Sequence, residues 1–127
     1  MRDLTKYRLD SANERLEVSQ EMIAGGRYRI SISNSYYAIF NAVRALLAEV
    51  PIDFKKHSAV ISYFRREYVK TGLFDVKFSD YIGAAFTARQ YSDYEDFFIA
   101  SQEEAETQYQ HAVEFVEAVR KYLEESK

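Results

Sequence analysis

The apolar residues of this chain recur at intervals of three and four along most of its length, which is the spacing of amphipathic helices. The pattern predicts helices over about residues 3–24, 27–49, 53–71, 75–91 and from 101 onward. The second and the last helix carry an unbroken apolar seam, formed by Ile32, Tyr36, Ile39, Val43, Leu46 and Val50 and by Ala105, Tyr109, Ala112, Val116, Val119 and Leu123. In the first helix one face is shared by Leu9, Ala12, Leu16, Ser19 and Ile23.

Turn and cap residues separate these segments. Gly25-Gly26 predicts a helix end, Pro51 breaks the chain, and Gly72 closes the third helix. The sequence "SQEE", with Ser101 and Glu104, is a capping box that predicts the start of the last helix. Three long helices joined by short connections predict one all-α domain over residues 1–127, an antiparallel up-and-down bundle of four to five helices.

Composition narrows the class of protein. Of the 127 residues 47% are hydrophobic, and one proline and four glycines are too few for a turn-rich β fold. The absence of cysteine excludes disulfides and cysteine-based zinc sites, and the two distant histidines, His57 and His111, argue against a metal centre. No apolar run approaches the roughly 20 residues of a membrane span, and the N-terminus lacks the apolar core of a signal peptide. We therefore expect a cytoplasmic protein without a membrane segment, metal or cofactor.

The charges are unevenly distributed. The net charge of −3 argues against broad, nonspecific wrapping of nucleic acid. Residues 55–70 hold five lysines and arginines against one acid, however, and the chain from Asp93 onward holds ten acids against three bases. Such patches match a polyanion, a second copy of the chain or a charged partner, and they also occur as solvated helix faces.

Arg89 is the residue whose place in the pattern needs an explanation. It continues the inward stripe of Phe78, Ile82 and Ala85 in the fourth helix, where an unpaired guanidinium cannot be buried. One interpretation is an ion pair with Asp93, four residues later on the helix. The other is a polar cleft at the end of the bundle, shared with Asp93 and Tyr94, in which Arg89 binds a phosphate. The residue chemistry alone favours the ion pair.

Three further side chains are candidates for ligand binding. Tyr91 and Tyr94 could stack on a nucleobase beside Arg89. His57 lies next to two lysines and could transfer protons, although a lone histidine more often packs or faces solvent. No glycine-rich phosphate loop, serine–histidine–aspartate arrangement or paired-histidine metal motif accompanies them.

Three blocks of the sequence resemble a known family. The segments "SNSYYAIFNAVRALLAE", "KKHSAVISYFRREYVKTGLFD" and "ARQYSDYEDF", in this order, are similar to those of HEPN domains, above all to the small stand-alone HEPN proteins of uncharacterised function. The resemblance covers about residues 6–123. It implies a dimeric helical bundle, often encoded beside a minimal nucleotidyltransferase in toxin–antitoxin pairs.

The resemblance also bears on catalysis. HEPN ribonucleases cut RNA without metal through an arginine followed, after four residues, by a histidine. The arginine corresponds to Arg89, but the histidine position is Tyr94. A phenol, with a reference pKa of about 10, is a poor proton shuttle at neutral pH. Toxin-type motifs place a nucleotidylated tyrosine two residues later, where this chain has Asp96. The resemblance shifts the interpretation of Arg89 towards a ligand-binding residue.

Two functional hypotheses follow. The first is a non-catalytic module that binds a nucleotide, RNA or a nucleotidyltransferase partner through Arg89, Asp93, Tyr94, Tyr91 and His57. The alternative is a metal-independent ribonuclease toxin. We also predict a homodimer, because the two full seams exceed the need of one thin bundle and several tyrosines are left over: Tyr28, Tyr63, Tyr109 and Tyr122.

Overall fold

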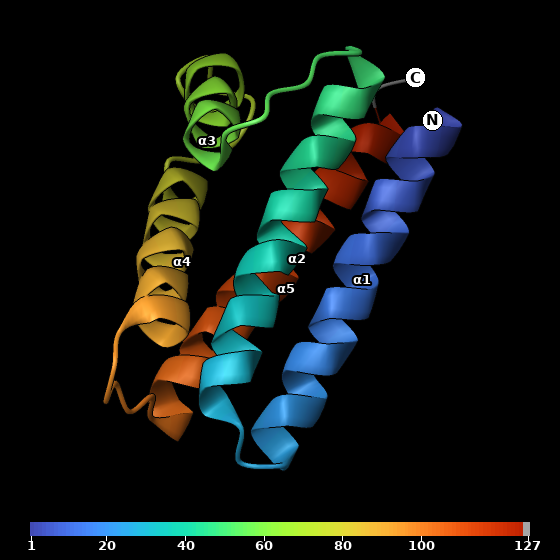
Figure 1. The fold of residues 1–127 in the computed structure, drawn as a ribbon. Helices are drawn as coiled ribbons and strands as arrows, with labels where there is room; N and C mark the ends of the chain where they lie inside the picture. Colours follow the sequence, from blue (N-terminus) through green and yellow to red (C-terminus); the bar gives the residue numbers. More distant parts are fainter. Residues whose placement is uncertain (126–127) are drawn as a thin grey trace.

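Four long α-helices, running alternately down and up, and one short helix across their end form the bundle seen in the computed structural model, which describes residues 1–125 (Figure 1). The elements are α1 (Asp3–Ala24), α2 (Tyr28–Glu49), α3 (His57–Phe64), the π-helix η1 (Arg65–Val69), α4 (Lys77–Tyr94) and α5 (Gln102–Glu125). No strand occurs within this part of the chain, so the all-α antiparallel bundle is confirmed. The short α3 lies across the end of the bundle where both termini are found.

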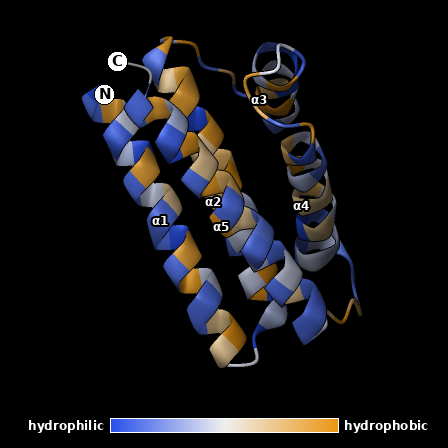
Figure 2. Ribbon diagram, turned by 180° about the vertical axis from the view of Figure 1, so that it is seen from behind, coloured by the Kyte–Doolittle hydropathy of each residue, from blue (hydrophilic) through white to orange (hydrophobic). Residues whose placement is uncertain are grey.

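The core is built around α2, which packs against α1, α4 and α5. Most of its predicted seam is buried, including Ile32, Tyr36 and Leu46. Val50 is an exception: it follows the last residue of α2 and is 41% exposed, because the chain leaves the bundle there. Figure 2 shows the hydrophobic residues of the long helices alternating with hydrophilic ones, as amphipathic helices require.

Helix ends are fixed as the sequence predicts. Gly26 has a φ of 75°, and the N–H groups of Gly26 and Arg27 donate to the carbonyls of Ile23 and Met22, which is a Schellman motif. The Ser101 hydroxyl accepts a 3.0 Å hydrogen bond from the Glu104 N–H at the start of α5. Both predicted caps are confirmed.

The third helix differs from its prediction. It begins at His57 rather than near Asp53, and residues 52–56 form a loop in which the Asp53 carboxylate accepts a hydrogen bond from the Phe54 N–H. After Phe64 it continues as the π-helix η1, which apolar periodicity does not reveal. His57 is therefore the first residue of a helix and stands at the edge of the preceding loop.

The fourth helix ends three residues later than predicted, at Tyr94. The Arg29 guanidinium of α2 donates to the backbone carbonyls of Ser92 and Glu95, and a cation at this end also complements the helix dipole. Asp93 and Tyr94 consequently belong to the last turn of α4 and not to the loop after it.

The four tyrosines that we expected to be left over are not. Tyr63 and Tyr122 pack against the main core, Tyr28 packs against a smaller cluster around Ile32, and Tyr109 is half-buried. The exposed large apolar side chains lie elsewhere. Phe97 and Ile99, after α4, are 98% and 87% exposed.

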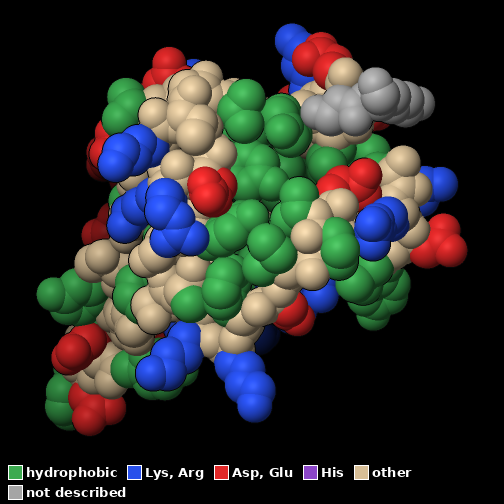
Figure 3. All heavy atoms as spheres, turned by 90° about the horizontal axis from the view of Figure 1, so that it is seen from above, with side chains coloured by type: hydrophobic (Ala, Val, Ile, Leu, Met, Phe, Trp, Pro, Cys, Tyr) green, Lys and Arg blue, Asp and Glu red, His purple; other side chains and the backbone are tan. Residues whose placement is uncertain are grey.

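The end of the bundle near the termini also exposes apolar surface. Figure 3 looks onto this end and shows hydrophobic side chains gathered over its middle. Within the described residues, no helix combines the length and the apolar character that crossing a membrane requires.

Candidate functional site

Arg89 lies where α4 packs on α2, and its side chain is only 11% exposed. Its Nε donates to the Asp93 carboxylate at 3.1 Å, so the predicted i,i+4 ion pair is present. Its Nη2 donates to the hydroxyls of Tyr37 at 2.7 Å and Tyr94 at 3.3 Å. Arg89 is thus a largely buried, multiply bonded cation rather than one open to water.

Tyrosine rings surround the same guanidinium. Its central carbon lies 5.2 to 5.4 Å from the ring centroids of Tyr36, Tyr37 and Tyr94, within cation–π range. These residues come from two helices, and Tyr36 and Tyr37 are neighbours on α2. The contacts fix the position of the positive charge from several sides.

The site is built to keep this charge. Burial by itself lowers the pKa of Arg89, but Tyr37, Tyr94 and Asp93 outweigh it, and the pKa rises above its ordinary value. Burial raises the pKa of Tyr36, although Arg89 opposes that shift. At neutral pH the arrangement therefore holds a guanidinium cation against the ring of a protonated Tyr36.

His57 joins this group through Tyr36. The Tyr36 hydroxyl and the His57 Nδ1 are 2.8 Å apart, and the imidazole stacks on Phe40 with ring centroids 4.0 Å apart. Burial, and then the charges of Arg89 and Arg44, lower the pKa of His57. The structure therefore brings His57 into the neighbourhood of Arg89, although the two lie far apart in the sequence.

Tyr91 is the predicted site residue that lies apart. It is half-exposed on another face of α4, and its ring is 5.8 Å from that of Phe98. Conversely, Tyr37 was not among the site residues predicted from the sequence, although it accepts the shortest hydrogen bond from Arg89. The adjacent pair Tyr36-Tyr37 on an apolar seam was the only signal for it.

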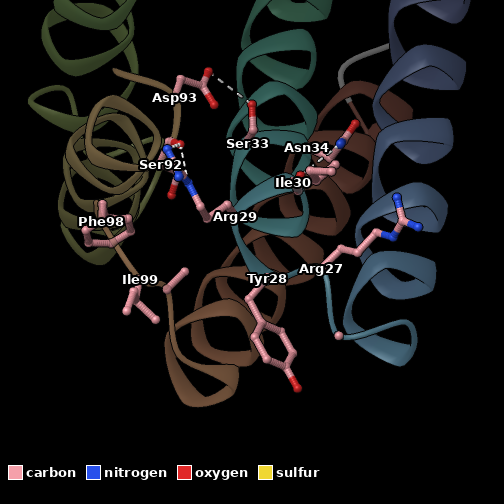
Figure 4. A pocket seen from close by; sticks show the side chains of 12 residues that line it. Arg27, Tyr28, Arg29, Ile30, Ser33, Asn34, Ser92, Asp93, Phe98 and Ile99 are labelled. Atoms are coloured by element: carbon pink, nitrogen blue, oxygen red, sulfur yellow. Dashed lines mark hydrogen bonds between the residues drawn. The ribbon is translucent and has the colours of Figure 1, made fainter. Parts of the chain in front are cut away.

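Arg89 and its partners Asp93, Tyr36, Tyr37 and Tyr94 are called the Arg89 cluster below. A groove of about 790 Å³ opens beside this cluster, between the start of α2 and the connection from α4 to α5 (Figure 4). Asp93 belongs to both, since it pairs with Arg89 and lines the groove, where it also accepts a hydrogen bond from Ser33. Apolar walls come from Phe98 and Ile99. The Ser92 hydroxyl is buried at the groove without a hydrogen-bond partner among the described residues.

This arrangement suits the binding of an anion with an attached flat or apolar group. A fixed guanidinium provides charge-assisted hydrogen bonds to phosphate or carboxylate, and exposed Tyr94 provides a ring for stacking. The groups at hydrogen-bond distance from Arg89 are the carboxylate of Asp93 and the phenol hydroxyls of Tyr37 and Tyr94.

Comparison with known proteins relates the chain to one family. A family model described as "HEPN domain" matches residues 5–122. A protein of Methanocaldococcus jannaschii named "Putative toxin" is 35% identical over 96% of this chain and 82% of its own length. A second "Putative toxin" of that organism is 30% identical, over 92% of this chain and 87% of its own. A "UPF0332 protein" of Thermotoga maritima is 29% identical, over 98% and 94%.

Proposed function

Since the chain belongs to the HEPN family, we propose that it is a non-catalytic binding protein in which Arg89 holds a phosphate group of a nucleotide or of RNA. The observation that carries the proposal is the state of the guanidinium. It is fixed by Asp93 and two tyrosine hydroxyls and lies against three tyrosine rings. A cation held in this way needs no reorganisation to bind an anion.

The guanidinium retains hydrogen-bonding capacity for a ligand. It has five N–H donors, and its Nε and Nη2 make three hydrogen bonds in the structure. Among residues 1–125 the Nη1 atom makes none, which leaves its two N–H groups for a phosphate. Asp93 neutralises part of the charge, and a phosphate would compete with it for Arg89.

The neighbouring groove offers space for the rest of the ligand. It adjoins the cluster at Asp93, and Phe98 and Ile99 give it apolar walls against which a base can pack. Tyr94 is 66% exposed, and its ring lies on the side of Arg89 as a surface for stacking. A nucleotide with its phosphate at Arg89 and its base in this groove is the ligand class that the site fits best.

The non-catalytic part of the proposal rests on Tyr94. It occupies the position where the resemblance places the ribonuclease histidine, and a phenol exchanges protons poorly at neutral pH. In the structure its hydroxyl hydrogen-bonds Arg89, which is a positioning contact.

We propose further that the protein is a cytoplasmic homodimer that works with a minimal nucleotidyltransferase in a toxin–antitoxin-like pair. The family membership and the names of two relatives, "Putative toxin", support such a setting. The exposed Phe97 supplies apolar surface of the kind that a dimer interface buries.

The alternative is a metal-independent ribonuclease toxin, and one observation favours it. The Tyr36 ring packs on Arg89, and its hydroxyl contacts His57. An imidazole is therefore present near the arginine, although position 94 is a tyrosine and not a histidine. In this hypothesis Arg89 and His57 or Tyr94 are the working groups.

One assay decides between the two. Purified protein is incubated with end-labelled single-stranded RNA, with and without EDTA, and binding and cleavage are both measured on native and denaturing gels. The proposal expects RNA that is bound and intact. Cleavage in EDTA that is lost in Arg89→Ala would instead establish the ribonuclease.

A further inference from the structure

A second pocket of about 540 Å³ lies where the chain passes from α2 into α3. Its lining residues come from the end of α2, the following loop and the first residue of α3: Phe40, Arg44, Asp53, Phe54, Lys55 and His57. It is connected to Arg89 through Tyr36, whose hydroxyl is 2.8 Å from the His57 Nδ1, and through the ring of Tyr37, 6.1 Å from that of His57.

The charges of this pocket do not cancel. Asp53 is its one acid, and it is 58% exposed and lies 3.4 Å from the Arg44 guanidinium and 3.8 Å from that of Arg8. Within residues 1–125 Lys55 makes no ion pair at all. Three cations around one carboxylate leave a local positive charge in a protein whose net charge is −3.

His57 adds a neutral donor. Because burial raises the pKa of Tyr36, this hydroxyl keeps its proton and can donate it to the His57 Nδ1. In the neutral tautomer whose Nδ1 accepts this hydrogen bond, the imidazole proton is on Nε2, which makes no hydrogen bond with the described residues. An Nε2–H at the wall of a positive pocket can donate to an anionic oxygen.

The remaining walls are aromatic. Phe54 is half-buried, with Tyr63 packed behind it at a centroid distance of 5.6 Å, and Phe40 lies under the imidazole. The pocket volume falls in the range of sites that hold small ligands, roughly 300–1,000 Å³. Arginine, lysine and an imidazole donor beside a fixed phenyl ring suit a phosphate attached to a base.

From these contacts we infer a second nucleotide-binding site, in which Arg44, Lys55 and His57 hold a phosphate and Phe54 packs against the base. The inference takes the class of its ligand from the proposed function but depends on different residues. Asp53 then acts as the internal competitor that the phosphate displaces from Arg44.

The two histidines of the chain allow a direct test by proton NMR. The His57 Hε1 signal, identified as the one that remains in His111→Gln, is followed while uridine 5′-monophosphate is added. We expect this signal to shift saturably and the pKa of His57 to rise, because a bound phosphate stabilises the imidazolium. The His111 signal is the internal control, since His111 lies on α5 against Tyr81.

Three variants give the expected order of affinities. Arg44→Gln should weaken nucleotide binding about tenfold by removing a charge-assisted contact. Asp53→Asn should strengthen it several-fold, because the amide no longer competes for Arg44 yet keeps an acceptor for the Phe54 N–H. Lys121→Gln removes an exposed charge on α5, outside the lining of both pockets, and should change nothing.

The outcomes separate this site from the one at Arg89. A wild-type His57 signal that does not respond to millimolar nucleotide overturns the inference, and so does an undiminished response in Arg44→Gln. In Arg89→Gln the response should persist with an affinity within a few-fold of the wild type. If Arg89→Gln abolishes it while Arg44→Gln does not, the nucleotide binds only at Arg89 and the second site is refuted.

Discussion

The Tyr37 hydroxyl on α2 accepts a 2.7 Å hydrogen bond from the Arg89 guanidinium on α4. This contact joins residues 52 positions apart. It sets the direction of the largely buried Arg89 side chain, which lies on the inward stripe of α4. The Nε of the same guanidinium donates to the carboxylate of Asp93, one turn further along α4. Tyr37 is therefore a positioning residue for Arg89.

The first prediction is that Tyr37→Phe misorients Arg89 without removing it. Loss of one hydrogen bond to a charged group should lower the free energy of unfolding by about 1.5–3 kcal/mol at most. RNA affinity should fall several-fold, because the guanidinium can then rotate. Chemical denaturation and fluorescence anisotropy measure the two effects.

The control is Tyr63→Phe, a half-buried tyrosine for which no hydrogen bond is found in the described residues. An RNA affinity equal to that of the wild type would show that Tyr37 has no part in positioning Arg89.

The second prediction concerns pH. The pKa of His57 in the folded protein is held below its ordinary value of 6.5 by burial and by the charges of Arg89 and Arg44. The unfolded chain therefore binds a proton more readily, and the free energy of unfolding should fall as the pH drops through 6.5 and below.

Replacing His57 by glutamine should remove this part of the pH dependence. Urea denaturation at several pH values between about 5 and 8 provides the measurement. His111→Gln is the matched control, and it should retain the slope due to His57. Identical pH profiles for His57→Gln and the wild type would contradict the account of the His57 environment.

The third prediction concerns a buried polar contact between α1 and α2. The Ser19 hydroxyl is fully buried and lies 2.7 Å from the Ser35 hydroxyl, 2.8 Å from that of Ser31 and 3.0 Å from the Ser31 carbonyl. Ser19→Ala removes a hydrogen-bond partner from each of these buried groups and should destabilise the fold by about 1–3 kcal/mol. Ser11→Ala, on the same helix but less buried, should cost less. Equal midpoints of thermal unfolding for the two variants would argue against the serine contact as a source of stability.

The sequence predicted the helices well because apolar spacing reports which face of a helix is buried. It placed Ser19 on the inward face, although serine gives no apolar signal of its own. It misplaced the start of α3 and the end of α4, where side chains decide the boundary. The Asp53 carboxylate bonds the Phe54 N–H in the loop before α3, and the Arg29 guanidinium bonds carbonyls at the end of α4.

The candidate site could be predicted only in part, for a related reason. Arg89, Asp93 and Tyr94 share one helix, so their spacing showed that they could meet. The contacts of Arg89 with Tyr37, and of Tyr36 with His57, join separate elements and depend on how these pack. The burial of Arg89 was likewise unforeseen, because it results from three tyrosine rings that the sequence does not bring together.

The fourth prediction tests the proposed dimer. Phe97 has a φ of 62°, a strained value for a bulky residue, and its side chain is 98% exposed. If it packs against a second copy, wild-type protein should sediment as a dimer at micromolar concentration and Phe97→Gly should shift it to monomer. Leu73→Ser, which removes an exposed apolar residue between η1 and α4, is the control and should leave the dimer intact. A wild-type protein that sediments only as a monomer refutes the dimer.

The measurement that tests the central claim most directly is RNA binding by Arg89 variants, followed by fluorescence anisotropy with a labelled single-stranded oligonucleotide at fixed salt. Arg89→Ala should weaken binding about ten- to a hundredfold by removing a charge-assisted contact to phosphate. Arg89→Lys keeps the charge but loses the planar fork, so its affinity should lie between the two. Because Arg89 is largely buried, circular dichroism and denaturation first establish the folded fraction of each variant. Graded loss of affinity per folded molecule is the predicted result. Unchanged affinity per folded molecule in Arg89→Ala, with a loss of stability alone, would show that Arg89 only holds α4 against α2, and would contradict the account.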